Sequence, residues 1–520
     1  MRSLNSGDIN GFCEHFLANT PVLINCETDD WSLRQLFQDT EGNFSTDGFT
    51  ALHGEHVILV HVGRGGCSEE MNIREFVARI RQEGEELYAK DWHFFQFPDT
   101  NQSYEVPPVF SDDWLNLYWQ RIRGDESDYR FLYIGGPGTV TSVHHDVLHS
   151  YSWSLNLHGQ KLWTLWRPEE THLLRAVGHA ADGEYVRDAR PGQYDAEVFP
   201  GVSQTSPVSV MQGEGQALFV PAGWYHMVQN MGAATHEDNV EVEGGGACGD
   251  SPVTVSVNHN WINGFNIYQS WRFLVREMDN TRREMWDFLD ATERSRFECA
   301  EVTSEAPVWL GREGAGMSSG EWARHCELTL RVNAGLGCRE FLEMVISRVV
   351  CLCSIHFEVH QSTSSLQLLA VDRYFPFLTT HISVEATDRQ VYRHLSSAPV
   401  ASAPHHNQFR NTDVKHEGCG EAAAHASIRV ADVSCESLAT HLSAAGAHLQ
   451  YPISSFHYCI LEVLKVFTEL ENSQRMIEYL GYVYSSVNNS DVTDSGSRSD
   501  HIFGPLARVK ELLTQALTLS

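Results

Sequence analysis

Hydrophobic and polar positions divide the chain into a strand-rich part and a helical part. Between residues 130 and 265, short apolar runs alternate with Gly and Pro turns, as in SYSWSLNLHGQKLWTLW and QALFVPAGWYHMVQN. Many short strands at this spacing are typical of an antiparallel barrel or sandwich. After residue 264 the chain changes to longer stretches in which apolar residues recur at helical spacing. The pattern therefore predicts a mainly β fold with flanking helices, followed by an α-helical C-terminal region.

The segment before the barrel mixes strands and helices. PVLIN (21–25) and HVILVHV (56–62) are apolar and rich in β-branched residues, which predicts two strands. In residues 72–80 the apolar side chains recur at helical spacing, so a helix is expected there. LYAKDWHFFQF (87–97) is predicted to be an aromatic strand.

Four helices are predicted after the barrel, with one long interruption. Residues 268–289 and 339–352 have helical spacing, and further helices are expected at 456–471 and 504–517. Residues 385–450 are rich in Ser, Ala and His, a composition that favours loop or disorder. The sequence contains no internal repeat, and nothing in it assigns a function to residues 385–450.

These changes of character predict four regions. Residues 8–290 are expected to form the β domain, residues 291–384 a helical extension, and residues 385–450 a flexible segment. Residues 451–520 are expected to form C-terminal helices, which either brace the barrel or make a homodimer interface. The apolar face within residues 456–467 fits both alternatives.

One run interrupts the barrel pattern. Residues 234–251, ATHEDNVEVEGGGACGDS, are acidic and rich in Gly. Such a composition is typical of a surface loop. We expect an insertion between two strands that would otherwise form a hairpin.

Composition and charge narrow the class of protein. Hydrophobic residues make up 42% of the chain, and 13 Trp and 25 Phe fit a folded enzyme better than a disordered scaffold. The chain carries 37 basic and 68 acidic residues, a net charge of −31. This balance argues against direct nucleic-acid binding, which needs clustered Lys and Arg. It is compatible with a basic protein partner, although acidity by itself chiefly promotes solubility.

The sequence also bears on location. No run of about 18 apolar residues is present, so we expect no membrane-spanning helix. The N-terminus lacks the apolar stretch of a signal peptide, and no basic cluster is typical of a nuclear signal. The 12 cysteines include no CxxC pair, so we expect reduced thiols. A cytoplasmic location is expected, and a nuclear one is also compatible.

The run His144-His145-Asp146 is the strongest candidate for chemistry. On a strand, successive side chains alternate between faces, so His144 and Asp146 would point one way and His145 the other. His226 follows a predicted strand and a Pro-Gly turn, and could supply a third ligand from an adjacent strand. Two His and one carboxylate form the facial triad of non-haem Fe(II) oxygenases. Of the three open metal positions, two would take a bidentate 2-oxo acid and the last would take O2.

Lys161 adds to this combination. It lies 17 residues after His144, on a strand that we predict beside the HxD strand. A Lys that points into a barrel is costly unless it meets an anion, and the distal carboxylate of 2-oxoglutarate would be that anion. An outward Lys on a solvated face is the alternative, although Leu162 and Trp163 flank it.

Three runs resemble the JmjC-domain hydroxylases: GGPGTVTSVHHDVLHSYSWSLNLHGQKLWTLW, FVPAGWYHMVQN and VSVNHNWING. Within that family the chain is most similar to the type of jumonji-domain-containing protein 4, which KDWHF at 90–94 also matches. The resemblance covers residues 8–290 well and 320–350 faintly. It implies that residues 8–290 form a catalytic domain with a double-stranded β-helix core, the cupin or JmjC jelly roll. The acidic insertion at 234–251 departs from the compact hairpin usual in the family.

The resemblance also implies a set of cosubstrate contacts. Lys161 is placed at the distal carboxylate of 2-oxoglutarate, together with Thr141 and Tyr88. Asn258 falls where many of these hydroxylases place an amide near the metal-binding end of the cosubstrate. Two residues occupy places where some relatives have a longer, cosubstrate-contacting Asn: Ser152 and Ser154.

The activity implied by the resemblance uses Fe(II), 2-oxoglutarate and O2 to hydroxylate a protein, namely a lysine of the eukaryotic class-one translation release factor. An N-methyl-lysine demethylase is the alternative within the same chemistry, but the sequence has no zinc-finger or chromatin-reader pattern. A non-catalytic cupin-fold binding module would need neither the triad nor Lys161. A cupin with a different metal and no 2-oxo acid would not need Lys161.

Overall fold

The structure is a computed structural model. It describes residues 3–345 apart from gaps at 64–66, 82–84, 98–99, 101, 123–127, 179–183, 233–252 and 289–318, and then residues 348, 453–473, 476 and 480. The chain divides into two units, residues 1–345 with 458–466 and residues 346–457 with 467–520.

The N-terminal third alternates strands and helices, as the sequence predicts. Its elements are β1 (Ser3–Asn5), α1 (Ile9–Ala18), β2 (Val22–Asn25), α2 (Ser32–Gln35), α3 (Asp47–His53), β3 (Val57–Val62), β4 (Cys67–Asn72), α4 (Ile73–Ile80), β5 (Leu87–Trp92), the 3-10 turns η1 (Phe94–Gln96) and η2 (Pro108–Phe110), and α5 (Trp114–Ile122). Helix α4 begins where the Asn72 side chain accepts a 2.8 Å hydrogen bond from the Glu75 amide. This is the usual way in which a helix satisfies a free N-terminal amide.

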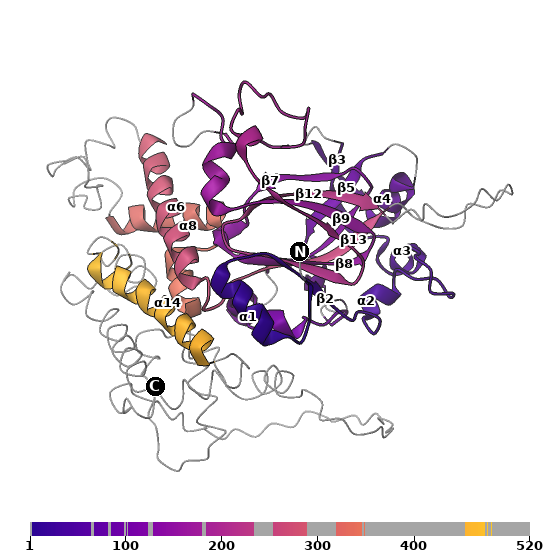
Figure 1. The fold of residues 1–520 in the computed structure, drawn as a ribbon, viewed down its shortest axis with the longest axis horizontal. Coiled ribbons are helices and arrows are strands. Elements are labelled where there is room, and N and C mark those ends of the chain that lie inside the picture. The colour runs from indigo at the N-terminus through magenta and orange to yellow at the C-terminus, as the bar shows by residue number, and fades with distance from the viewer. Residues whose placement is uncertain are drawn as a thin grey trace, which may run out of the picture. The chain divides into compact units, whose positions relative to one another are not determined.

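The remaining strands build the barrel. They are β6 (Arg130–Gly135), β7 (Val140–His144), β8 (Tyr151–His158), β9 (Gln160–Trp166), β10 (Val208–Gln212), β11 (Gln216–Val220), β12 (Tyr225–Gly232) and β13 (Thr254–Trp261). One sheet has nine strands in the order β1-β2-β11-β8-β13-β6-β5-β3-β4, and the other has four in the order β10-β9-β12-β7. All strand pairs except β1–β2 are antiparallel. Figure 1 shows the two layers facing each other. The predicted jelly-roll fold with flanking helices is confirmed.

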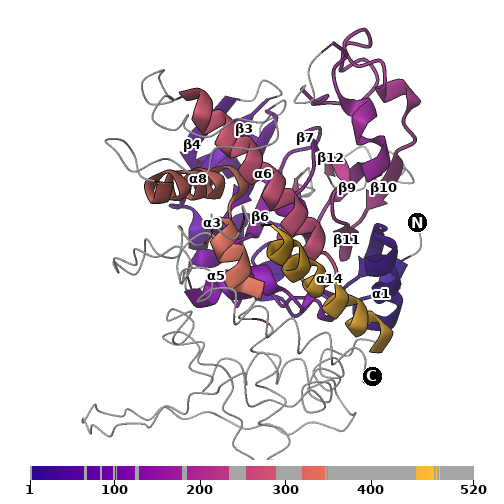
Figure 2. The ribbon, with the colours of Figure 1, turned by 90° about the vertical axis from the view of Figure 1, so that its left-hand side faces the viewer.

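Helices follow the barrel. α6 (Ile267–Phe288) matches the predicted helix at 268–289, and it lies beside α8 (Ser319–Ala334), as Figure 1 and Figure 2 show. Residues 338–345 are helical, and the rest of the predicted 339–352 helix lies outside the described residues except for residue 348. α14 (Ile453–Asn472) confirms the predicted helix at 456–471. The segments 385–450 and 504–517 also lie outside the described residues. Among the described helices, none is both long and apolar enough to cross a bilayer.

Three local predictions were wrong. The strand predicted at 87–97 ends at Trp92, and a 3-10 turn follows. The strands on either side of the acidic insertion, β12 and β13, would not form a hairpin, because they belong to different sheets. Lys161, on β9, does not lie beside the HxD strand β7, because β12 pairs with both and separates them. In the second and third cases the chain crosses between sheets, which local periodicity does not report.

The large sheet has an apolar outer face and a polar inner face. On the outer face, the rings of Phe16 in α1 and Tyr151 in β8 stack with centroids 5.2 Å apart. Alternation along β13 places Ser256, Asn258 and Asn260 on the inner face. A polar face that points into a sandwich is costly unless its groups find partners or ligands. The interior of this barrel is therefore built to hold something polar.

The small sheet covers that polar face. Alternation along β9 directs Lys161, Trp163 and Leu165 toward the large sheet, and β12 directs His226 and Val228 the same way. Trp163, Leu165 and Val228 belong to an apolar cluster between the sheets. The opposite face of the small sheet packs on the segment between β9 and β10, which contains the 3-10 turns η4 (Pro168–Leu174) and η5 (Val202–Gln204). Lys161 and His226 are thus held inside the barrel.

The part of α14 in the first unit is packed within the single chain. Val463, Leu464 and Val466 are buried. The Nζ of Lys465 lies 5.5 Å from the centroid of the Tyr268 ring on α6. These contacts fit the predicted brace. The homodimer remains a prediction.

Candidate metal centre

Two neighbouring strands of the small sheet bring the three predicted ligands together. His144 is the last residue of β7, and its register partner on β12 is His226. Asp146 follows two residues after His144, just beyond the strand end. The three side chains each offer one ligand atom, and these atoms all lie within 4.8 Å of one another. This is the only such group of His, Cys, Asp and Glu found among the described residues.

The two imidazoles are oriented by backbone carbonyls. His144 Nδ1 lies 2.7 Å from the Ser142 carbonyl oxygen, and His226 Nδ1 lies 3.2 Å from that of Trp224. A carbonyl accepts only, so each Nδ1 carries the proton and each Nε2 keeps its lone pair. His226 Nε2 is 4.0 Å from Asp146 Oδ2, with room for an ion between them. This arrangement of a ligating nitrogen backed by a hydrogen-bonded one is typical of metal-binding histidines.

The Asp146 carboxylate is held from the large sheet. Ser152 Oγ donates to its Oδ2 at 2.7 Å, and Asn260 Nδ2 donates to its Oδ1 at 2.7 Å. Burial alone would raise the pKa of Asp146, but attraction to His226 and His144 and these two hydrogen bonds outweigh it, so its pKa lies below the usual value. Asp146 is therefore ionised at neutral pH.

The buried histidine is neutral at the same pH. Burial lowers the pKa of His226 to about 4, and the neighbouring His144 acts in the same direction. A neutral imidazole and an ionised carboxylate are the protonation states that a metal ion requires of its ligands. The donor set of two nitrogens and one oxygen on one side of the ion fits Fe(II) in a facial triad.

The turn that carries Asp146 is strained and packed from behind. Leu148 and His149, in the 3-10 turn η3 (Val147–His149), have φ angles of 59° and 47°. The Phe273 ring of α6 lies 4.7 Å from the His149 ring and 5.5 Å from that of His145. Residues with positive φ other than Gly persist where the surroundings impose them. Helix α6 therefore fixes the turn in which the carboxylate ligand lies.

Lys161 lies inside the barrel, and no described residue supplies it with a counter-ion. Its side chain is buried, and its Nζ donates to Ser154 Oγ at 3.1 Å and to Ser256 Oγ at 2.5 Å. Burial lowers the pKa of Lys161 to about 7. Within the described residues no carboxylate forms an ion pair with it. A buried cation with neutral partners fits the binding of an anion, because a carboxylate would compensate its charge.

The other predicted cosubstrate residues converge near Lys161. Its register partner on β12 is Asn230, and Thr141 is paired with Val228 on the same strand. Thr141 Oγ1 donates to the Tyr88 hydroxyl at 3.4 Å. Burial raises the pKa of Tyr88 to about 12, so its phenol remains neutral. The structure thus brings Thr141 and Tyr88 to one wall of the same space.

Asn258 lies next to the lysine rather than beside the metal ligands. Its Nδ2 donates to Ser256 Oγ at 3.0 Å, and the same hydroxyl accepts from Lys161. Asn260, two residues further along β13, is the amide that contacts the metal ligand Asp146. Asn260 and Ser256 belong to the site although neither was predicted from the sequence to do so. The alternation in SVNHN, which places Ser256, Asn258 and Asn260 on one face, is the signal that identifies them.

The two serines of β8 contact other side chains of the site. Ser152 donates to Asp146 Oδ2, and Ser154 accepts from Lys161 Nζ. Tyr133 of β6 also belongs to this space, because Lys161 Nζ lies 5.5 Å from its ring centroid. No sequence motif marks Tyr133, which is recognised only through the pairing of β6 with β13.

Comparisons with known proteins agree with this geometry. The model of the cupin-like domain matches residues 10–267. The 2-oxoglutarate and iron-dependent oxygenase JMJD4 of Danio rerio is 30% identical over 349 residues, which cover 64% of this chain and 69% of that protein. This chain belongs to the JMJD4 family of 2-oxoglutarate and iron-dependent oxygenases. The resemblance stated from the sequence is thereby confirmed, and the JMJD4 cofactors are those that the His-Asp-His donor set fits.

Other JMJD4 relatives show how far the likeness extends. JMJD4 of Gallus gallus is 31% identical over 304 residues, which cover 55% of this chain and 65% of that protein. A protein of Arabidopsis thaliana named arginine-specific demethylase JMJ20 is 33% identical over 323 residues, 56% of this chain and 62% of that protein. The chain therefore spans less than two thirds of the length of these two relatives. JMJD4 family membership settles the fold and the cofactor class.

Proposed function

We propose that this protein is a protein hydroxylase that uses Fe(II), 2-oxoglutarate and O2 to hydroxylate a lysine of the eukaryotic class-one translation release factor. One observation carries the proposal: the His144–Asp146–His226 triad shares the space between two sheets with Lys161, which has no counter-ion among the described residues. A metal triad alone would fit many cupins. A buried cation within the same barrel adds a place for the second carboxylate of a 2-oxo diacid.

Different residues would bind the metal and the distal end of the cosubstrate. His144, Asp146 and His226 would hold iron, and Lys161 would bind the distal carboxylate of 2-oxoglutarate. When bound, iron and 2-oxoglutarate supply the oxidising chemistry, in which one atom of O2 enters a substrate C–H bond and the other enters succinate. Binding of the carboxylate keeps the Lys161 ammonium charged, against the effect of burial.

The surroundings fix these groups before any ligand arrives. Ser152 and Asn260 hold Asp146, so the carboxylate does not reorient when a metal binds. The hydroxyls of Thr141 and Tyr88 lie on the wall near Lys161 and would donate to the same distal carboxylate. Trp163, on β9, belongs to the buried apolar cluster between the sheets and would shield the site from water on that side. Such preorganisation strengthens each electrostatic interaction in the site.

The choice of lysine and of release factor rests on the sequence motifs shared with the JMJD4 type. The net charge of −31 has the right sign for a partner that presents a lysine. Demethylation is the second candidate, favoured by the names of two relatives: arginine-specific demethylase JMJ20 and lysine-specific demethylase JMJ21, the latter 24% identical over 226 residues. The two reactions differ in product, since hydroxylation leaves oxygen on the peptide and demethylation releases formaldehyde.

The first test is anaerobic. Purified protein mixed with Fe(II) and 2-oxoglutarate should develop the weak visible absorption of a metal-bound 2-oxo acid. We expect His144→Ala to abolish the band, Lys161→Ala to require more 2-oxoglutarate, and His172→Ala, an exposed histidine outside the site, to behave as the parent. No band at saturating iron and cosubstrate would overturn the oxygenase assignment in favour of a cupin-fold binding module.

The second test identifies the reaction. The protein is incubated aerobically with purified release factor, and peptides are examined for a gain of 16 Da on lysine while formaldehyde is assayed in parallel. Oxygen on lysine without formaldehyde supports the hydroxylase. Formaldehyde from a methylated lysine or arginine peptide, with no retained oxygen, replaces it with a demethylase.

A further inference from the structure

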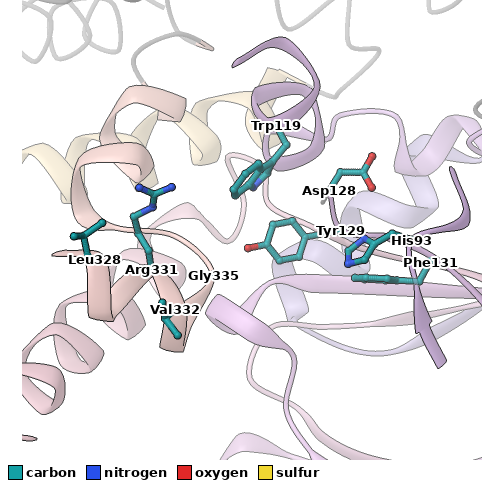
Figure 3. A pocket seen from close by; sticks show the side chains of 9 residues that line it. All are labelled: His93, Trp119, Asp128, Tyr129, Phe131, Leu328, Arg331, Val332 and Gly335. Carbon is teal, nitrogen blue, oxygen red and sulfur yellow. The ribbon is translucent and has the colours of Figure 1, made fainter. Parts of the chain in front are cut away.

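A cavity that contains none of the metal ligands opens in the same unit of the chain. It has a volume of about 530 Å³ and lies between β6 and α8, as Figure 3 shows. Its size is in the range of sites that bind small molecules or side chains. It is lined by His93, Trp119, Asp128, Tyr129, Phe131, Leu328, Arg331, Val332 and Gly335.

The strand register relates this cavity to the polar space between the sheets that contains Lys161. Phe131 is paired with Asn258, and directly paired residues of an antiparallel sheet point to the same face. Two residues further along β6, Tyr133 lies near Lys161 inside the barrel. Phe131 therefore faces the interior of the barrel while it forms a wall of the cavity. The cavity and the metal centre therefore lie on the same face of the large sheet.

A hydrogen-bond path joins the cavity wall to a metal ligand. The Asn260 amide donates to the Tyr129 carbonyl oxygen at 3.0 Å, and the Asn260 side chain donates to Asp146. Asn116 Oδ1 accepts from the Tyr129 amide at 2.8 Å, and its Nδ2 donates to the Asn260 carbonyl oxygen at 2.9 Å. Two strand spacings, about 10 Å, separate β6 from Ser152 on β8, which contacts the same carboxylate. The wall of the cavity that contains Tyr129 is thus directly paired with Asn260, the residue that holds the metal ligand Asp146.

The lining suits an apolar side chain. The rings of Trp119 and Tyr129 have centroids 6.1 Å apart, and Leu328 and Val332 stand at the rim with 49% and 84% of their surface exposed. Burial lowers the pKa of His93, so this ring is neutral at pH 7.

The two charges of the lining are already compensated. Arg331 forms a 3.0 Å ion pair with Glu340, and Asp128 pairs with Arg130. A charged occupant would therefore find no complementary group there, whereas an apolar one would cover exposed apolar surface.

We propose that this cavity binds a large apolar side chain of the polypeptide substrate, within about three residues of the residue that is oxidised. The inference rests on the proposed function and adds a subsite to it. An extended peptide advances about 3.3 Å per residue, so the distance of about 10 Å across β13 corresponds to about three residues. The occupant is a segment of the substrate because the cavity continues the face of the sheet on which the reaction takes place.

The test uses the full chain and a peptide library with one fixed lysine, in which each flanking position in turn is fixed as every amino acid. Hydroxylation is read as a gain of 16 Da. The parent should select Leu, Ile, Met, Phe or Trp at one flanking position within three residues of the lysine. Leu328→Glu combined with Val332→Glu should lower turnover of those peptides at least tenfold and shift the preference at that position to Lys or Arg.

A matched control carries the same changes elsewhere. Leu52→Glu combined with Val57→Glu alters an exposed helical Leu and an exposed Val, 64% and 65% exposed, outside the cavity. It should keep the parent preference. The anaerobic absorption with Fe(II) and 2-oxoglutarate should be unchanged in both double variants, which reports on the metal site independently.

Three other outcomes would each overturn the subsite, and they differ in what else they overturn. Hydroxylation with no apolar preference, or with the same preference in both double variants, overturns the subsite and leaves the hydroxylase in place. A normal absorption band with no hydroxylated peptide overturns the lysyl substrate and the subsite with it. A change of oligomeric state in the Leu328→Glu, Val332→Glu variant, with the preference retained, assigns the cavity to a second copy of the chain instead.

Discussion

Asn260 Nδ2 donates a 2.7 Å hydrogen bond to Asp146 Oδ1, across 114 residues of sequence and between the two sheets of the barrel. The bond couples the carboxylate ligand to β13, a strand that supplies no ligand itself. It explains why the large sheet carries a polar inner face: its residues orient the groups that the small sheet presents. The consequences can be measured one residue at a time.

Removal of this bond should weaken metal binding without loss of a ligand. We expect Asn260→Ala to lower the affinity for Fe(II) or Mn(II) by about 10- to 100-fold, because partners of ligating groups have effects of this size. Asn258→Ala, on the same face of β13, should leave metal affinity within about twofold, since Asn258 contacts Ser256. Titration with Mn(II), followed by electron paramagnetic resonance, measures both. Equal losses in the two variants would contradict a specific role for Asn260.

Lys161 should be needed for the cosubstrate but not for the fold. Lys161→Met keeps the length of the side chain and removes a buried cation that has no counter-ion in the described residues. We expect 2-oxoglutarate affinity to fall at least tenfold, with metal affinity unchanged. The melting temperature of the ligand-free protein should stay equal or rise, because replacement of a buried charge by an apolar group is often neutral or stabilising. A large fall in melting temperature would show instead that Lys161 is structural.

The affinity for 2-oxoglutarate should depend on pH through Lys161. Burial lowers the pKa of Lys161 to about 7 in the free protein, whereas the bound carboxylate favours the ammonium. Binding therefore takes up a proton above pH 7, and the Kd should rise by up to about tenfold per pH unit from pH 7 to 9. Below pH 7 the lysine is already charged, so this dependence should vanish. Calorimetry in buffers of different ionisation enthalpy tests the proton uptake, and Lys161→Met should show none.

Metal affinity should depend on the packing of helix α6 against the turn that carries Asp146. Phe273→Leu removes the ring that packs on His145 and His149, so the strained turn loses part of its support. We expect metal affinity to fall several-fold. Phe37→Leu changes a buried ring elsewhere, stacked on Phe49 with centroids 4.5 Å apart. Both variants should lose about 1–2 kcal/mol of stability, but only Phe273→Leu should alter the metal titration.

The stability of the protein should depend on the glycine at the C-terminal end of α8. Gly335 has a φ of 80°, and a Cβ there would lie 2.3 Å from the Tyr129 hydroxyl oxygen, whereas Gly178, with a φ of 76°, has nothing within 4 Å. Gly178→Ala should lower the free energy of unfolding by about 1–2 kcal/mol, because only the positive φ disfavours a side chain there. Gly335→Ala should lower it by more, because the clash with Tyr129 is added. Tyr129→Phe removes the clashing oxygen, so it should recover part of the loss in the double variant. Chemical denaturation of the parent, Gly335→Ala, Tyr129→Phe and the double variant measures the coupling between residues 335 and 129.

Much of the site is local in the sequence, and that part could be read from it. The two-residue spacing of His144 and Asp146, the Pro-Gly turn before His226, and the apolar neighbours of Lys161 are features of short segments. The alternation of apolar and polar residues between 130 and 265 also predicts strands, because the period of a strand is a local property. The family resemblance rests on the same short runs, and the comparisons confirm it.

Only the tertiary structure decided which strands and side chains contact one another across the barrel. Between β7 and β13 the chain crosses repeatedly from one sheet to the other, so β12 rather than β9 lies beside β7, and β12 does not form a hairpin with β13. The contacts of Ser152 and Asn260 with Asp146, and the cavity between β6 and α8, join segments far apart in the chain. Periodicity fixes which face a side chain takes on its own strand but carries no information on which strand will face it. That choice is made by the packing of two sheets around a polar interior, where each buried charge must find its partner.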